Sequence, residues 1–100
     1  MTKLALYVEL KARPGKEDEV AEFLKSAQAL VAAEPETIAW FAVRYDHNTF
    51  AIFDAFNHEA GRQAHLNGKV AAALMARAEE LFETPPQIKK PEVLADRLPR

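Results

Sequence analysis

The segment 36–57 limits the possible folds of this chain more than any other part of the sequence. Two runs rich in aromatic and β-branched residues flank a short polar tip, Asp46-His47-Asn48. Asp and Asn tolerate left-handed backbone angles, so this tip is typical of a turn. Two such runs around a short turn predict an antiparallel β-hairpin.

Neither face of this hairpin has the polar character of a solvated surface. An antiparallel sheet with one solvated face should alternate polar and apolar residues. The first run alternates Ile38, Trp40, Ala42 and Arg44 with Ala39, Phe41, Val43 and Tyr45, and the second alternates Phe50, Ile52, Asp54 and Phe56 with Ala51, Phe53 and Ala55. Helices of the same chain can cover one face, and we expect a partner subunit to cover the other.

The residues before the hairpin predict one strand and one helix. Residues 3–12 alternate with a period of two, which is typical of a strand, and Pro14-Gly15 ends it. Residues 16–34 place apolar side chains at steps of three and four, which predicts a helix. Pro35 ends that helix because a residue before proline is disfavoured in the α region.

Two helices and a last strand are expected after the hairpin. A short helix from His58 to about Leu66 has Asn57 as its predicted N-cap and Gly68 as its predicted C-cap. A second helix is expected over about 69–83, where Pro85-Pro86 stops it. The tail 87–100 has the pattern of a strand, and its prolines favour an edge position.

This order of elements predicts an α+β fold. Strand, helix, strand, strand, helices, strand is the split βαβ pattern of ferredoxin-like domains, with an antiparallel sheet. Such a sheet carries helices on one face only. Because the bare face here is apolar, we expect a two-fold homodimer in which two sheets pack face to face.

The composition indicates one domain, residues 1–100, and excludes several kinds of function. The net charge of −2 gives no support to nucleic-acid or membrane binding. The chain has no cysteine and only three glycines, so it offers no thiol nucleophile and no glycine-rich phosphate loop. Without an apolar signal stretch or a membrane-length segment, we expect a cytoplasmic protein.

The chain resembles the antibiotic biosynthesis monooxygenase family, which includes small bacterial quinol monooxygenases. The resemblance rests on the segments 8–17, Trp40-Phe41, 50–56, 64–66 and 93–95. It implies a dimeric α+β barrel with a pocket between sheet and helices in each subunit. Several relatives oxidise phenolic or quinol-like substrates with O₂ and without metal or flavin, so the resemblance implies no cofactor.

Four residues are candidates for a substrate site. The resemblance places His65 near the pocket, and its ordinary pKa near 6.5 suits a general base that removes a phenolic proton. Trp40, the only tryptophan, can stack on a flat ligand and donate its indole N–H. Tyr7 and Phe53 are the further candidates for substrate contact. The alternatives are a structural histidine and aromatic residues that fill the core or the dimer surface.

The remaining polar residues are interpreted as structural. Arg44 and Asp54 interrupt apolar faces of the hairpin, and buried charges should be paired, so we expect an ion pair between them or across the dimer. Glu34 has no evident partner. The three histidines lack the spacing of metal ligands, so no metal site is predicted.

Two functions remain compatible with the sequence. The first is a cofactor-independent monooxygenase that oxidises a small phenolic or quinol-type aromatic molecule with O₂. The second is a non-catalytic dimeric module that binds a small ligand or stabilises an assembly. A cavity of a few hundred Å³ beside His65 would favour catalysis or ligand binding, because ligand sites measure about 300–1,000 Å³, and a filled space would favour a structural module.

Overall fold

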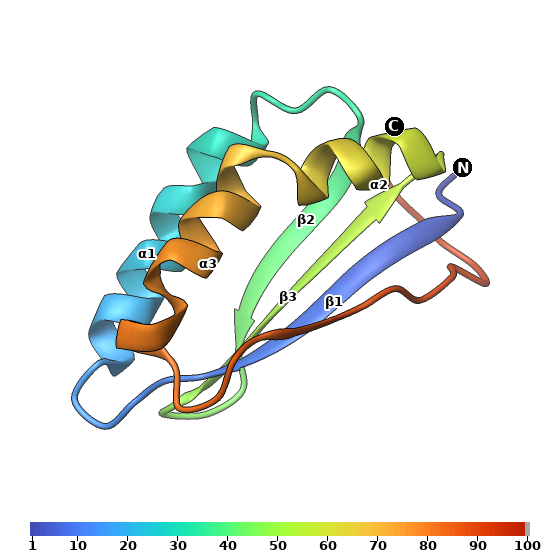
Figure 1. Ribbon diagram of the computed structural model, residues 1–100. Coiled ribbons are helices and arrows are strands. Elements are labelled where there is room, and N and C mark those ends of the chain that lie inside the picture. Colours follow the sequence, from blue (N-terminus) through green and yellow to red (C-terminus); the bar gives the residue numbers. More distant parts are fainter. Residues whose placement is uncertain (100) are drawn as a thin grey trace.

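The computed structural model describes residues 1–99 and contains four strands and three helices (Figure 1). In chain order these are β1 (Leu4–Lys11), α1 (Glu17–Val31), β2 (Thr37–Arg44), β3 (Thr49–Phe56), α2 (Glu59–Leu66), α3 (Lys69–Leu81) and β4 (Gln87–Lys89). The predicted hairpin corresponds to β2 and β3, and the predicted element order is confirmed.

The strands form one antiparallel sheet in the order β2-β3-β1-β4. β3 pairs antiparallel with β1 on one side and with β2 on the other. β1 and β2 are therefore parallel to each other with β3 between them, and α1 connects them. This is a split βαβ arrangement, so the predicted ferredoxin-like α+β fold is confirmed.

The helices cover one face of the sheet, where α1 and α3 lie side by side (Figure 1). The hydrophobic core fills the space between these helices and the sheet. It takes alternate residues of the strands and one stripe from each long helix, as the two periods require. Its buried members include Val8, Leu10, Val20, Leu24, Phe50, Ile52, Leu74, Leu81 and Phe82.

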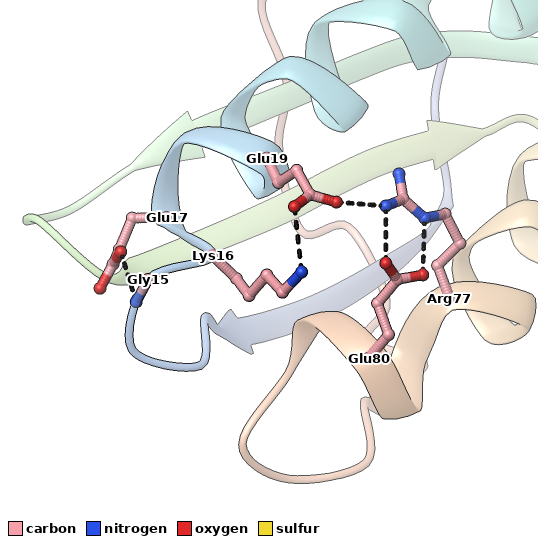
Figure 2. Close-up of polar contacts among 6 residues, drawn as sticks. All are labelled: Gly15, Lys16, Glu17, Glu19, Arg77 and Glu80. Atoms are coloured by element: carbon pink, nitrogen blue, oxygen red, sulfur yellow. Dashed lines mark hydrogen bonds and ion pairs between the residues drawn. The ribbon is translucent and has the colours of Figure 1, made fainter.

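A surface ion-pair network joins α1 to α3 (Figure 2). Arg77 Nη2 lies 2.6 Å from Glu19 Oε2 and 3.1 Å from Glu80 Oε2, and Lys16 Nζ lies 3.1 Å from Glu19 Oε1. Nearby, the backbone N–H of Gly15 donates to Glu17 at 3.0 Å, in a turn where Gly15 has φ of 86°. Exposed pairs of this kind stabilise weakly, so the apolar core dominates helix packing.

The structure corrects three expectations about the ends of elements. The last strand is limited to Gln87–Lys89, and the tail after it adds only an isolated bridge between Leu4 and Glu92; Arg100, the end of the predicted strand, lies outside the described residues. His58, not Asn57, is the N-cap of α2. Gly68 precedes α3 as its N-cap, while Asn67 caps the end of α2.

The second face of the sheet carries no helix from residues 1–99 (Figure 1). Several large apolar side chains on this open face are exposed: Phe41 at 55%, Val43 at 43%, Tyr45 at 60% and Phe53 at 39%. Tyr7 also lies there, opposite Phe53 in the register, and its hydroxyl is 3.1 Å from that of Tyr45. The open face is therefore an unusually apolar surface for a single chain.

Candidate functional site

A buried histidine bridges two carboxylates on the helix-covered side of the sheet. His65 Nδ1 lies 2.6 Å from Glu34 Oε1, and His65 Nε2 lies 2.9 Å from Asp54 Oδ2. Only 5% of His65 and 2% of Asp54 are exposed. Both ring nitrogens are thus engaged by oxygen acceptors away from water.

These surroundings favour the charged form of His65. Burial disfavours an imidazolium, but the hydrogen bonds to Asp54 and Glu34 outweigh it and raise the pKa of His65 from 6.5 to about 9. At neutral pH both nitrogens then carry a proton and donate to the carboxylates. A histidine in this state has no free lone pair with which to accept a proton.

Three separate elements supply this cluster. His65 comes from the last turn of α2, Asp54 from the second half of β3, and Glu34 from the connection between α1 and β2. The Thr37 hydroxyl also donates to Glu34 Oε1 at 2.8 Å. The Phe56 ring lies 5.6 Å from the His65 ring, centroid to centroid, and packs against one side of it. The histidine therefore holds α2 against the sheet.

Two complementary polar atoms near this cluster have no partner within residues 1–99. One is the second carboxylate oxygen of Asp54, Oδ1, and the other is the indole nitrogen of Trp40. Trp40 and Asp54 are directly opposite each other in the β2–β3 register, so their side chains project from the same face with Cβ atoms roughly 5 Å apart. Buried polar groups are nearly always paired, so such atoms call for an explanation.

Two hollows of different size lie on this side of the sheet. A cavity of about 30 Å³ beside His65 is lined by Asp54, Ile52, Leu66, Val70 and Leu74, among others. A groove of about 440 Å³ lies between α1 and β2, with lining residues that include Leu24, Gln28, Trp40, Ala42, Arg44 and Phe50. The hollow next to the histidine is small, and the hollow of ligand size is bounded by the tryptophan.

The four candidate site residues fall on opposite faces of the sheet. His65 and Trp40 lie on the helix-covered face. Tyr7 and Phe53 are register partners whose side chains lie on the open face. The sheet separates the two pairs, so of the four candidates only His65 and Trp40 lie on the same side, where they line different hollows.

The expected pair between Arg44 and Asp54 is wrong, although both residues lie on the same face. In the register Arg44 is opposite Phe50, and Phe50 precedes Asp54 on β3 by four residues. Its guanidinium donates to the backbone oxygens of Asp46 and His47, and it stacks 4.9 Å from the Phe50 ring. The prediction that Asp54, a lone carboxylate in an apolar strand, is buried and paired is confirmed, but its partner is His65.

Glu34 is the site residue that sequence reasoning missed. It lies at the end of a helical pattern, where an acidic residue is ordinary. Asp54 and Glu34 approach the ring of His65 from opposite nitrogens, so they do not converge on one point. Among residues 1–99, no group of three or more His, Cys, Asp or Glu side chains is arranged to hold a metal ion.

None of the helices in this range combines the length and apolarity needed to cross a bilayer.

Comparison with solved structures identifies the class of this fold. The chain is similar to PA3566 from Pseudomonas aeruginosa, with 22% identity over 95% of this chain and 97% of that one and a TM-score of 0.80. It is also similar to a Caulobacter crescentus protein provisionally named an antibiotic biosynthesis monooxygenase, with 15% identity over 94% and 92% of the two chains and a TM-score of 0.79. The protein thus shares the α+β fold of these two proteins, one of which bears the name of the family that the sequence resembles.

A third similarity is high enough to define a family. NE2512 from Nitrosomonas europaea, a protein of unknown function, is 58% identical over all of this chain and 97% of that one, with a TM-score of 0.97. The chain belongs to the same family as NE2512. No protein-family model matches the chain, and no curated protein matches it either.

Proposed function

We propose that this protein is a cofactor-independent monooxygenase that oxidises a small phenolic or quinol-type aromatic molecule with O₂. The observation that carries the proposal is the groove of about 440 Å³ bounded by Trp40, whose register partner Asp54 belongs to the buried His65 cluster. Its volume is within the range of small-molecule sites, about 300–1,000 Å³. The fold of the monooxygenase-like neighbours adds support at the level of class.

The proposed reaction needs no electrons from a cofactor. The substrate supplies all four electrons that reduce O₂: one oxygen atom enters the ring system, and the other leaves as water with two hydrogens of the substrate. Transfer of a phenolic proton to the free carboxylate oxygen of Asp54, Oδ1, prepares the ring for this step, because the resulting anion is electron-rich, and this proton then leaves with the water that forms.

The protonation state of His65 refines its proposed role. With a pKa raised to about 9, His65 must first lose a proton before it can accept one. At neutral pH its proposed role is to hold Asp54 in place and to stabilise negative charge that develops nearby. His65 then acts as a positioning residue for Asp54.

A homodimer is part of the proposal. A second copy of the sheet would cover the open face, which exposes Phe41 and Phe53. Specific interfaces bury more than ~1,000 Å², and two apolar sheet faces can supply that area. In this arrangement Tyr7 and Phe53 contribute to the interface, and the substrate groove of each subunit stays on the helix-covered side.

Oxygen uptake with a panel of hydroquinones and phenols tests the proposal. We expect metal-stripped, flavin-free protein to consume O₂ faster than the spontaneous oxidation in buffer. Because His65 positions Asp54, His65→Ala should lower the rate at least about tenfold, the effect of roughly 1.4 kcal/mol. The control His47→Ala alters an exposed histidine at the hairpin tip and should keep the wild-type rate. Equal rates for wild type and His65→Ala would refute the assigned role.

One observation favours the second candidate function, a dimeric module that binds a small ligand without converting it. The cavity directly beside His65 measures only about 30 Å³, and both nitrogens of the ring are already bonded. Saturable binding of a phenol with no oxygen uptake above the buffer rate, across the whole panel, would select this function over the first.

A further inference from the structure

We propose that Trp40 and Asp54 form a binding pair for the hydroxyl group of an aromatic ligand. The indole N–H of Trp40 would donate to the hydroxyl oxygen, and Asp54 Oδ1 would accept the hydroxyl proton in a hydrogen bond. This inference rests on the proposed use of the groove and adds the residues that select the ligand.

The two unpartnered atoms of Trp40 and Asp54 are chemically complementary. Trp40 Nε1 is a donor only, and a carboxylate oxygen is an acceptor only. Both are buried without a partner in residues 1–99, although their residues face each other across β2 and β3. A hydroxyl group is both donor and acceptor, so a single hydroxyl can satisfy both atoms. An ether or a methyl group cannot.

The groove beside Trp40 can hold the aromatic ring of such a ligand, whereas the cavity beside Asp54 cannot. Trp40 borders the groove of about 440 Å³, and Asp54 borders the cavity of about 30 Å³. The groove has the volume for an aromatic ring. The cavity has room for a group the size of one water, which needs at least about 10–15 Å³, but not for a ring. The two hollows share no lining residue, so the hydroxyl position in this proposal lies between them, where Trp40 and Asp54 face each other across β2 and β3.

The carboxylate of Asp54 is held in position by the His65 cluster. Its other oxygen, Oδ2, is held by His65 at 2.9 Å, and Glu34 holds the far side of the His65 ring at 2.6 Å. The carboxylate therefore cannot turn to serve a different donor without breaking this chain of contacts. An acceptor held in this way discriminates strongly, because a ligand without a donor leaves it unpaired.

Trp40 also provides a direct spectroscopic test, because it is the only tryptophan of the chain. ¹⁵N-labelled protein gives a single indole N–H resonance, which can be followed during titration with 4-chlorophenol and, as its matched ether, 4-chloroanisole. Nitrogen-purged buffer prevents oxidation. We expect the phenol to move the indole resonance downfield and to bind at least about tenfold more tightly than the ether, as one well-made hydrogen bond predicts.

Three variants assign this preference to its residues. Asp54→Asn should reduce the phenol-to-ether affinity ratio to about threefold or less, because the charged acceptor is lost. Asp18→Asn is the matched control, since it makes the same substitution at an exposed carboxylate in the first turn of α1 and leaves Trp40 and Asp54 unchanged, and the ratio should persist. If the Asp54→Asn spectrum shows an unfolded protein, Trp40→Phe replaces it, with affinities measured by calorimetry and the same loss of preference expected.

The outcomes separate this inference from the proposed function. Three results would overturn the inference: equal binding of phenol and ether, no binding of either at millimolar concentration, or an indole resonance that does not move when the phenol is added. An unmoved indole resonance is also the result expected if a buried water satisfies both atoms. Phenol-selective binding without oxygen uptake would support the inference while the monooxygenase proposal fails. Oxygen uptake without phenol selectivity would do the reverse.

Discussion

The carboxylate of Glu34 lies 2.6 Å from Nδ1 of His65, a residue 31 positions further along the chain. This contact ties the connection between α1 and β2 to the last turn of α2. Because Asp54 binds the other nitrogen, the histidine joins three separate elements through one ring. The stability of this region should therefore depend on both carboxylates.

Glu34→Gln is expected to destabilise the protein by roughly 2 kcal/mol, since it replaces a charge-assisted hydrogen bond in a buried setting. Urea denaturation at pH 7 followed by circular dichroism measures the effect. The control is Glu22→Gln, which breaks an exposed pair with Lys25 and should cost less than about 0.5 kcal/mol. Equal decreases in the free energy of unfolding of the two variants would show that the Glu34–His65 contact stabilises the fold no more than an exposed ion pair does.

The stability of the fold should depend on the protonation of His65. Its pKa is raised to about 9 in the folded protein, against 6.5 when unfolded. The associated stability is fully present below about pH 6.5 and is lost as the pH rises through about 9, a total of roughly 3 kcal/mol. NMR titration of the imidazole resonances, with His65 assigned from a His65→Gln variant, should give a midpoint near 9. A midpoint at or below 6.5 would contradict the described contacts.

Gly68→Ala should disturb the same cluster by steric contact. A Cβ at this position would lie 3.0 Å from Glu34 Oε2 and 3.2 Å from the backbone oxygens of Ala64 and His65. The Glu34 side chain can move, but the backbone oxygens of α2 cannot move easily. We expect a loss of about 1–3 kcal/mol and, because Glu34 is displaced, a lower pKa for His65 by NMR.

The matched control is Gly15→Ala, where the new Cβ meets nothing within 4 Å but the φ of 86° strains a non-glycine residue. That variant should lose roughly 1 kcal/mol and leave the His65 titration unchanged. A shift of the His65 pKa in Gly15→Ala but not in Gly68→Ala would reverse the expected pattern.

The proposed dimer predicts a specific effect of charge on the open face. Wild-type protein should scatter light as twice the chain mass of 11.2 kDa at micromolar concentration. Phe41→Asp should yield the monomer, because it buries an unpaired charge in the apolar interface. Met75→Asp alters a residue of similar exposure on α3, 53% against 55%, and should leave the dimer intact. A stable wild-type monomer would refute the proposed assembly.

The elements of the fold could be predicted because their signals are local. Each signal is contained in a few consecutive residues. These signals are the alternation in residues 3–12 and in the hairpin, the helical spacing after Pro14-Gly15, and the prolines at 35 and 85 that end helices. The caps of α2 could not be predicted, since Asn57 and His58 are both compatible with a helix start. The tail pattern at 93–98 resembled a strand, but a strand needs a partner, and only Gln87–Lys89 pairs regularly with β1.

The sequence by itself determined the α+β class, the order of elements and the two apolar faces of the hairpin, because side-chain periodicity determines which residues can be buried on one face. It also marked His65, Trp40, Tyr7 and Phe53 as candidate site residues, without the face of the sheet on which each lies. Only the tertiary structure decided that Asp54 and Glu34 hold His65, and that Tyr7 and Phe53 lie on the opposite face of the sheet from His65. Those relationships depend on which elements meet in space, and a hydrogen bond between residues 31 positions apart leaves no trace in local spacing.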